Sequence, residues 1–397
     1  MVWAVSKLGE VCNIVGGGTP SKSNEDFYGG EIPWATVRDM REELLSSTEL
    51  KITEEAIKKS STNLIPSGSI ITATRVGLGK VCILQQDTAI NQDLKAIIPN
   101  VGILDNGFLY WWLKSVSHEI VTAGTGATVQ GVKLTFIKLL EIPLPPIAEQ
   151  KRIVAILDKA FADIDRARAI TEQNLKNARE LFDSYLQQVF SQRGEGWVDY
   201  QMADICNITS KLVDPKKNEY LDLLHIGAGN IVSNTGELVD VKTAREEGLI
   251  SGKFVFDDSM ILYSKIRPYL MKVCRPTFIG LCSADIYPLA PIDGKIEKDY
   301  LFYLLLSKDF TDYAISGSGR AGMPKVNRNH LFSYPVTLPT IDKQRIYVEK
   351  INQISEQSQA LENLYCKKLT ELDSLKKSIL QKAFSGELTK DDTGAAA

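Results

Sequence analysis

Two long stretches of the chain, residues 147–191 and 341–385, carry apolar side chains at alternating spacings of three and four residues. Neither stretch contains glycine or proline, and charged residues fill the positions between the apolar ones. This pattern predicts two α-helices with a coiled-coil seam, each roughly 65 Å long at about 1.5 Å per residue. The predicted seam positions are Ile153, Leu157, Ala160, Ile164, Ala167, Ala178, Leu181, Tyr185 and Val189 in the first stretch and Ile351, Ile354, Ser358, Leu361, Tyr365, Lys368, Leu372, Leu375 and Ile379 in the second.

The two predicted helices can pair either between chains or within one chain. A heptad stripe taken alone favours dimerisation between chains. Here the two stripes have equal length and a folded segment separates them, which favours an intramolecular antiparallel pair. Pro145, Pro146 and Pro339 stand where the chain enters the helices, because proline fits the first helical turn but cannot continue a strand.

The remainder of the chain holds nearly all of the glycine and proline together with short β-rich runs. Strands are predicted at residues 69–76, 94–99, 259–266 and 285–291, and helices at residues 107–121 and 299–315. The pattern therefore indicates two mixed α/β (α+β) domains that alternate with the long helices. The predicted limits are residues 1–143 and 195–337 for the domains, 144–194 and 338–388 for the helices, and 389–397 for a disordered tail.

The chain is an internal duplication with a shift of 194 residues. Near the two starts, "EVCNI" from Glu10 matches "DICNI" from Asp204. Where each long helix begins, a proline, an isoleucine and a glutamine recur in the same register, which then holds without a gap along both helices. The middles of the two copies have diverged. Two copies are too few for a solenoid, so the duplication predicts a pseudo-twofold axis.

Composition excludes several classes of protein. The chain has 397 residues, of which 44% are hydrophobic and 24% charged, and no apolar run approaches the ~20 residues of a membrane-spanning helix. The N-terminus lacks the pattern of a secretion signal, so we expect a cytoplasmic protein with no membrane role. The net charge of −3 excludes little, because one basic face can lie within an acidic total.

The sequence offers no set of side chains typical of an enzyme or a metal site. Six cysteines form no CxxC pair and do not cluster with the three histidines, which predicts buried thiols and no zinc. His225 lies in an apolar run and is expected to be a packing residue. "GGGTP" from Gly16 and "GLGKV" from Gly77 lack the spacing of nucleotide-binding loops. No Asn-Pro-Pro-aromatic or Asp-Pro-Pro-Tyr motif for amino-methyl transfer occurs, and we expect a non-catalytic protein.

Basic and polar side chains recur on glycine-rich loops at matching places in the two copies. The cations that flank the first such loop are Arg75 and Lys80, and those in the corresponding place of the second copy are Lys265, Arg267 and Lys272. "GTGATVQGVK" at residues 124–133 similarly matches "GSGRAGMPKVNR" at residues 317–328. Glycine lets a backbone approach phosphate closely, and Arg, Lys, Gln and Asn can pair with base edges in the major groove. Loop composition alone, however, favours ordinary solvated loops.

Three further motifs stand out: "GGGTPSKSNEDFYGGEIPWATVRDM", "AINQDLKAIIP" and, most specific of the three, "IPLPPIAEQKRIVAILD" after "GTGATVQGV". On these motifs the chain resembles, over residues 1–388, the specificity subunit of type I restriction-modification systems. The second copy departs from the pattern, because "LPTIDKQRIYVEKI" lacks the paired proline and places Tyr347 where the first copy has Ile153. It also lacks the triple glycine after Ile208.

The resemblance implies a DNA-recognition protein in which two target-recognition domains are joined by two long helices. Each domain would read one half of a bipartite target in double-stranded DNA, and the coiled coil would set the gap in helical turns of roughly 34 Å each. It also implies that two modification subunits, which bind S-adenosylmethionine and methylate adenine, dock on the outward faces of the helices. Restriction subunits would join that core, and this chain would bind no cofactor itself.

The loop chemistry and the resemblance together indicate which side chains contact DNA, with phosphate contacts outnumbering base contacts. The expected contacts are Thr19, Ser21, Lys22, Arg38, Arg75, Lys80, Gln130 and Lys133 in the first domain and Lys211, Lys265, Arg267, Arg320, Lys325 and Arg328 in the second. Two alternatives stay open. The chain can be a stand-alone nucleic-acid methyltransferase or nuclease with an unrecognised site, or a coiled-coil scaffold whose domains bind proteins.

Overall fold

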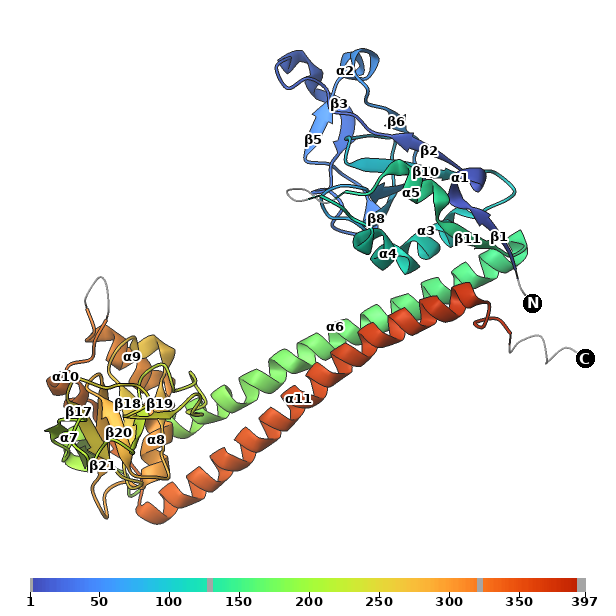
Figure 1. The fold of residues 1–397 in the computed structure, drawn as a ribbon. Coiled ribbons are helices and arrows are strands. Elements are labelled where there is room, and N and C mark those ends of the chain that lie inside the picture. The colour runs from blue at the N-terminus through green and yellow to red at the C-terminus, as the bar shows by residue number, and fades with distance from the viewer. Residues whose placement is uncertain (1–2, 127–130, 320–323, 391–397) are drawn as a thin grey trace, which may run out of the picture. The chain divides into compact units, whose positions relative to one another are not determined.

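The computed structural model describes residues 3–126, 131–319 and 324–390, and the chain divides into two compact units. Unit 1 comprises residues 1–171 and 367–397, and unit 2 comprises residues 172–366. Each unit holds one α/β domain together with part of two long helices, α6 (Ile147–Ser191) and α11 (Ile341–Ser385) (Figure 1). The predicted fold class, two α/β domains alternating with two long helices, is therefore confirmed.

The unit 1 domain contains two mixed sheets. The first has, in spatial order, β2 (Cys12–Gly16), β10 (Leu94–Pro99), β7 (Ile70–Ala73), β8 (Val81–Leu84) and β4 (Leu44–Leu45). The second has β5 (Leu50–Ile52), β3 (Tyr28–Ala35), β9 (Thr88–Ile90) and β6 (Leu64–Ile65).

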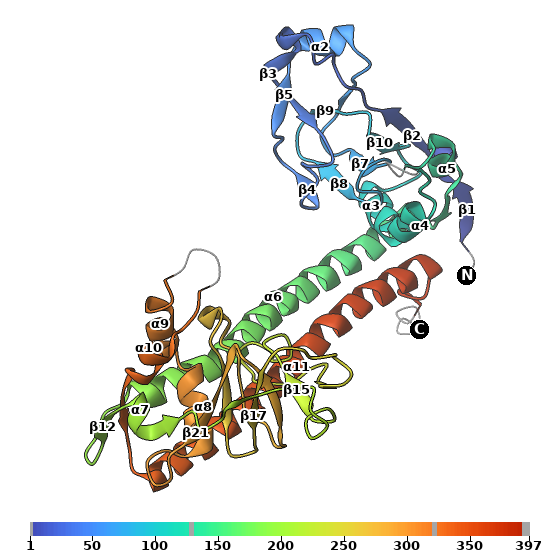
Figure 2. The same cartoon turned by 60° about the vertical axis from the view of Figure 1, so that its left-hand side comes forward.

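Strand β7 is buried on both faces, which explains why its residues are apolar except for Thr72. Ile70 packs in one cluster with α3 (Asn106–Ser115), whereas Ile71 packs in another with Ile90 of the second sheet. Figure 2 shows β7, β8 and β10 close to α3. The domain is thus layered, and the loop that follows β7 leaves this core at its edge.

The unit 2 domain repeats this plan. Its first sheet has β13 (Cys206–Asn207), β21 (Ile286–Pro291), β18 (Ile261–Ser264) and β19 (Val273–Cys274), which correspond in sequence to β2, β10, β7 and β8. Its second sheet has β14 (Leu212–Val213), β17 (Lys253–Phe256), β20 (Gly280–Ser283), β15 (Leu224–Ile226) and β16 (Lys242–Thr243). Helix α8 (Lys298–Leu306) packs against β18 and β19 (Figure 1).

Each helix predicted inside a domain is in fact two helices. The run at residues 107–121 forms α3 and α4 (Ser117–Thr122), and the run at residues 299–315 forms α8 and α9 (Lys308–Ser316). In the second case the break has a clear cause, because the Ser307 hydroxyl accepts a hydrogen bond from the Phe310 amide and so caps a new helix. Apolar residues keep their helical spacing on both sides of the break, so the sequence pattern could not reveal the break.

Short elements complete each domain. They are α1 (Leu8–Val11), η1 (Glu25–Phe27), α2 (Glu54–Lys59) and α5 (Leu134–Leu139) in unit 1, and α7 (Met202–Ile205), η2 (Pro268–Leu270) and α10 (Arg328–Phe332) in unit 2. Antiparallel pairs β1 (Ala4–Lys7) with β11 (Glu141–Leu144) and β12 (Val198–Gln201) with β22 (Pro335–Leu338) join the start of each domain to its end. They place the entry of each long helix beside its domain.

A buried glutamine near the start of each long helix ties that helix to its domain. Gln150 and Gln344 are both fully buried. The Gln150 carbonyl accepts from the Asp105 amide at 2.7 Å, and its amide group donates to the carbonyls of Ile103 at 3.1 Å and Pro145 at 2.8 Å. In unit 2 the Gln344 side chain makes the same bonds, with Glu297 at 2.9 Å, Lys295 at 3.1 Å and Pro339 at 2.9 Å. The repeated glutamine thus satisfies three backbone groups where domain and helix meet.

The two long helices pair with each other in opposite directions within the chain. In unit 1 the early part of α6 meets the late part of α11, where Arg168 pairs with Asp373. In unit 2 the late part of α6 meets the early part of α11, where Arg179 lies 3.0 Å from Glu362. The predicted intramolecular antiparallel coiled coil is therefore confirmed.

Some sequence-based expectations about burial were wrong. Leu181 and Leu375 were placed on the seam, but they are 40% and 46% exposed. Five cysteines are buried as predicted, whereas Cys366 is exposed on α11.

Three further points concern the ends and limits of the fold. The predicted domain limits stay predictions. Of the tail predicted at residues 389–397, residues 391–397 lie outside the described residues and Thr389 is buried. In the part of the chain that the structure describes, no helix has the length and apolar character needed to cross a membrane.

Candidate nucleic-acid interface

In unit 1 the candidate site begins at the turn between β7 and β8. The buried strand ends at Ala73, and the chain reverses through positive φ values at Val76, Gly77 and Gly79. Glycine adopts such angles without strain, which allows a tight turn here. As a result Arg75 leaves the sheet edge with 52% of its side chain exposed, although the sequence predicted that the strand would continue to residue 76.

A groove of about 570 Å³ beside this turn brings several predicted contacts together. Thr19, Lys22 and Arg38 line it, and they come from two loops that lie far from the turn in sequence. Gln92 and Asp93, from the loop before β10, complete its polar wall. These side chains can donate to phosphate or to base edges, which is the chemistry expected of a DNA-reading surface.

The glycines of the first loop act through packing. A Cβ added at Gly17 would lie 1.9 Å from the Asn91 carbonyl oxygen, and one at Gly18 would lie 2.4 Å from the Ser61 hydroxyl. The Gly18 amide also donates to the Ile90 carbonyl at 2.9 Å. The triple glycine therefore lets its loop press against the end of β9, and this contact places Thr19 at the groove.

Internal contacts hold the polar side chains of this groove. The Thr19 hydroxyl donates to the Gln92 carbonyl oxygen, and the Arg75 guanidinium lies 3.7 Å from the carboxylate of Asp93. Asp93 is only 18% exposed in its side chain, so it is a fixed partner for the more exposed arginine. Gln92 was missed as a candidate, although it stands in the "AINQDLKAIIP" signature.

Lys80, Ser21 and Lys133 are not among the residues that line this groove. Lys80 is exposed, and its ammonium donates to the Met40 carbonyl at 3.3 Å. Ser21 is exposed and shares a hydrogen bond of 2.8 Å with Ser23. Lys133 is exposed at the N-cap position of α5. Gln130 lies outside the described residues.

In unit 2 a groove of about 330 Å³ gathers Lys265 and Lys325 around one carboxylate. Their ammonium groups lie 3.5 Å and 3.1 Å from Asp285. Burial alone would raise the pKa of Asp285, but the hydrogen bond and charge of Lys325, with those of Lys265, outweigh it and lower the pKa. The Lys265 ammonium also lies 5.4 Å from the centre of the Tyr287 ring. The site therefore holds two cations on an ionised acid.

The other candidates of the second domain surround this groove or lie apart from it. Arg267 is exposed, with φ of +50°, and its amide donates to the Pro324 carbonyl at 2.9 Å. Arg328 is exposed at the first position of α10, and Lys211 is exposed just before β14. Lys272 donates to the Ala228 carbonyl at 2.5 Å. Arg320 lies outside the described residues.

The two sites share one arrangement despite their diverged loops. In each, a cation comes just after the buried strand, β7 or β18. An aspartate comes just before the neighbouring strand of the same sheet, β10 or β21. A later loop forms a β-bridge with the residues that follow the buried strand. The cations are Arg75 and Lys265, the acids are Asp93 and Asp285, and the bridges join Arg75 to Gly131 and Ile266 to Lys325. The duplication thus preserves a cation held by a carboxylate at the edge of each domain.

The described residues hold no other obvious centre of chemistry. They contain no cluster of three or more His, Cys, Asp or Glu side chains suited to a metal ion. His225 is buried as predicted, with Nδ1 at 2.8 Å from Glu247. Burial lowers the pKa of His225 and outweighs the opposing charge of Glu247, so the imidazole is neutral at pH 7 and packs within the domain.

Both copies of the duplication match a known protein family. The sequence profile of the family described as type I restriction modification DNA specificity domain matches residues 2–175 and 194–371. The chain is 30% identical over 322 residues to the EcoDI specificity subunit of a type I restriction enzyme from Escherichia coli, which covers 72% of this chain and 71% of that one.

Solved structures show the same fold. One chain from a study of complex assembly and conformational transition of the type I R-M system has a TM-score of 0.76 at 20% identity, with 98% of both chains covered. The HsdS subunit from Thermoanaerobacter tengcongensis has a TM-score of 0.66 at 20% identity, with 97% of both chains covered. Because the family profile matches both copies of the duplication and spans most of the sequence, this chain belongs to the type I restriction-modification DNA specificity family.

Proposed function

We propose that each domain of this specificity subunit reads one half of a bipartite target in double-stranded DNA, while the coiled coil fixes the gap between the halves. The observation that carries the proposal is the duplicated cation and carboxylate at the edge of each domain, with Arg75 on Asp93 and Lys265 on Asp285. Two sites of similar plan but different side chains suit two half-sites of different sequence.

Within each site, the exposed cations are the best candidates for contacts to phosphate, and the polar groove beside them is the best candidate for base readout. Thr19, Lys22, Arg38 and Gln92 line one groove in unit 1. In unit 2 the counterpart groove is smaller and holds Lys265, Lys325 and Asn327. The remaining predicted contacts, including Gln130 and Arg320, stay predictions.

Two modification subunits are the proposed protein partners, and duplicated apolar side chains support this. Ile170 on α6 and Leu364 on α11 occupy equivalent positions and are 55% and 56% exposed. Leu181 and Leu375 form a second equivalent pair, also exposed. Large apolar side chains exposed at the same places in both copies suit two copies of one partner protein.

The chemistry of the complex is proposed to reside in those partners. Modification subunits would bind S-adenosylmethionine and methylate adenine, and restriction subunits would join the assembly in the cytoplasm. This chain would bind no cofactor and would supply recognition and spacing. The scaffold and stand-alone enzyme alternatives receive no support from the family match.

The proposal is tested by sequencing methylated adenine in a host that expresses this chain with its modification subunit. A bipartite motif with an unread gap is expected. Replacing residues 1–143 with another recognition domain should change one half of that motif and leave the other half and the gap unchanged. A continuous motif, or methyl transfer by the purified chain without a partner, would contradict the proposal.

A further inference from the structure

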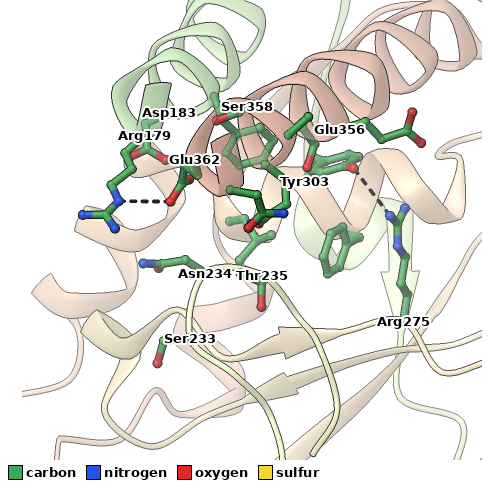
Figure 3. Close-up of a pocket in the computed structure, with 17 residues that line it drawn as sticks. Arg179, Asp183, Ser233, Asn234, Thr235, Arg275, Tyr303, Glu356, Ser358 and Glu362 are labelled. Atoms are coloured by element: carbon green, nitrogen blue, oxygen red, sulfur yellow. Dashed lines mark hydrogen bonds and ion pairs between the residues drawn. The ribbon is translucent and has the colours of Figure 1, made fainter. Parts of the chain in front are cut away.

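Unit 2 contains a groove of about 800 Å³ bounded by α6, α11, α8 and the loop at residues 233–235 (Figure 3). Its apolar part is aromatic. The rings of Phe182 and Tyr303 lie 6.3 Å apart, and the guanidinium of Arg275 lies 4.7 Å from the centre of the Phe302 ring. Tyr303 and Phe302 are only 3% and 2% exposed and form the floor of the groove, whereas Phe182 is half-buried at its wall. A concave site with an aromatic lining is typical of a place where another side chain binds.

The groove carries negative charge without a counter-charge. Its cations are already paired, since Arg179 lies 3.0 Å from Glu362 and Arg275 lies 3.0 Å from Asp299. The carboxylates of Asp183 and Glu356, by contrast, make no hydrogen bond or ion pair with the residues that the structure describes. The groove therefore favours a cation and disfavours the phosphates of DNA.

The pKa of Asp183 agrees with this charge distribution. Burial raises the pKa of this carboxyl group, and no cation close by reverses the effect. A lysine or arginine from a partner would stabilise the ionised form.

The corresponding place in unit 1 shows what fits such a groove. The duplication aligns Ser355 of α11 with Phe161 of α6, and Tyr303 with Trp111. In unit 1 the Phe161 ring lies 4.3 Å from the Trp111 ring and is only 7% exposed. A ring of the chain itself thus occupies the position that the small Ser355 leaves open in unit 2.

In unit 1 an ammonium group also lies beside the Phe161 ring. Lys376 lies 5.2 Å from the centre of the Phe161 ring and pairs with Asp165. In unit 2 the position of Lys376 is taken by Phe182. The Arg275 guanidinium, 5.4 Å from the centre of the Tyr303 ring, is already paired with Asp299. Relative to unit 1, the positions of Ser355 and Phe182 therefore lack an aromatic ring and an ammonium group beside it.

The groove also continues the apolar surface proposed for partner docking. Phe182 and Asn363 line it and are the direct neighbours in sequence of the exposed Leu181 and Leu364. A protein that covers these two leucines would reach the groove.

We infer that the modification subunit docked on unit 2 inserts an aromatic side chain, with a neighbouring lysine or arginine, into the groove formed by Phe182, Tyr303 and Ser355 and edged by Asp183 and Glu356. The inference rests on the proposed function and deepens it. Because Phe161 fills the equivalent place in unit 1, the two docking sites are unequal, and the site on unit 2 gains contacts that the other lacks.

The test uses the full chain, the purified modification subunit and native mass spectrometry across a titration. Ser355→Phe should fill the groove as Phe161 does, and it should weaken binding of one of the two modification subunits about tenfold or more. Ser355→Ala is the matched control, because it keeps the groove open and should bind both copies as the unchanged chain does. Asp183→Lys adds repulsion at the edge of the groove and should weaken the same copy.

Thermal unfolding of Ser355→Phe shows whether the variant is folded, and Asp183→Lys gives an independent reading if it is not. Two modification subunits bound with unchanged affinity to both variants would overturn the inference while leaving the proposed assembly intact. Failure of the unchanged chain to bind any modification subunit would overturn both. If the variants instead released a second copy of this chain and kept both modification subunits, the groove would bind this chain and the assignment of the modification subunit to it would be overturned.

Discussion

The two units hold the long helices together with ion pairs at equivalent positions, yet both pairs place the cation on α6. Arg168 of α6 pairs with Asp373 of α11 in unit 1, and Arg179 of α6 pairs with Glu362 of α11 in unit 2. The duplication aligns Arg168 with Glu362 and Arg179 with Asp373, so the charges at equivalent positions are reversed.

The apolar pattern that the two helices share would also permit α6 to pair with a second α6, or α11 with a second α11. The reversed charges favour the observed pairing of α6 with α11 over these two. Two copies of α6 in the same antiparallel register would bring Arg168 against Arg179. Two copies of α11 would bring Glu362 against Asp373. Like charges at such positions disfavour both arrangements, whereas the unlike helices attract each other. The apolar residues retained from the duplication thus give affinity, and the diverged charges select the partner helix.

The largest effect is expected where the two units are most alike, at the buried glutamines. Gln150→Leu would leave the amide of Asp105 and the carbonyls of Ile103 and Pro145 without partners, at a cost of about 2–4 kcal/mol in the free energy of unfolding. Gln344→Leu should cost a similar amount. Urea unfolding followed by circular dichroism measures both.

Gln187→Leu is the matched control, because Gln187 is an exposed glutamine on the same helix as Gln150. It should change the free energy of unfolding by less than about 0.5 kcal/mol. A similarly small change for Gln150→Leu would show that the three bonds do not join the domain to the helix.

The second largest effect is expected on DNA binding, where variants of the two candidate sites should affect different halves of the target. Arg75→Ala is expected to weaken DNA binding by about 1–3 kcal/mol if the arginine reads a base, and by less if it contacts phosphate. It should alter preference in one half of the target, whereas Lys265→Ala should alter the other half. Binding of the assembled complex to DNA variants in each half-site measures this.

Lys59→Ala is the control for charge alone, since Lys59 is an exposed cation of α2 that pairs with Glu55 outside the groove. Unchanged affinity and unchanged target preference for Arg75→Ala would remove Arg75 from the candidate contacts.

Features set by local sequence were predictable, whereas features set by contacts between distant residues were not. The long helices were predicted because their period and lack of glycine and proline depend only on neighbours along the chain. The contact between Thr19 and Gln92 joins residues 73 positions apart, so no local pattern could reveal it. Leu181 was misplaced because the buried face runs from Ala178 through Phe182 to Leu186, and the pattern could not distinguish a spacing of three residues after Ala178 from a spacing of four.

A smaller, pH-dependent effect should distinguish unit 2. His225 is buried with Glu247 at 2.8 Å and Lys253 nearby, and burial lowers its pKa from the ordinary value of 6.5. The unfolded chain therefore takes up a proton at higher pH than the folded domain does. The stabilising contribution should be complete above pH 6.5 and should be lost as the pH falls below that value. Unfolding of the chain and of His225→Gln at several pH values measures this, and an equal slope in both would contradict it.

The smallest effect concerns the helix ion pair and tests the opening comparison directly. Arg179→Glu places two acids together, and it should cost only about 0.2–1 kcal/mol because this pair is partly solvated. The double variant Arg179→Glu with Glu362→Arg restores an ion pair of opposite polarity and should recover the stability of the unchanged chain. Chemical unfolding of the four proteins gives the coupling energy.

The double variant should differ from the unchanged chain in one respect, its self-association. Helix α6 would then carry the cation of Arg168 together with the acid introduced by Arg179→Glu, so two copies of α6 in the antiparallel register would attract each other. Sedimentation should therefore show more self-association for the double variant than for the unchanged chain. Equal sedimentation of the two proteins would mean that these charges do not select the partner helix.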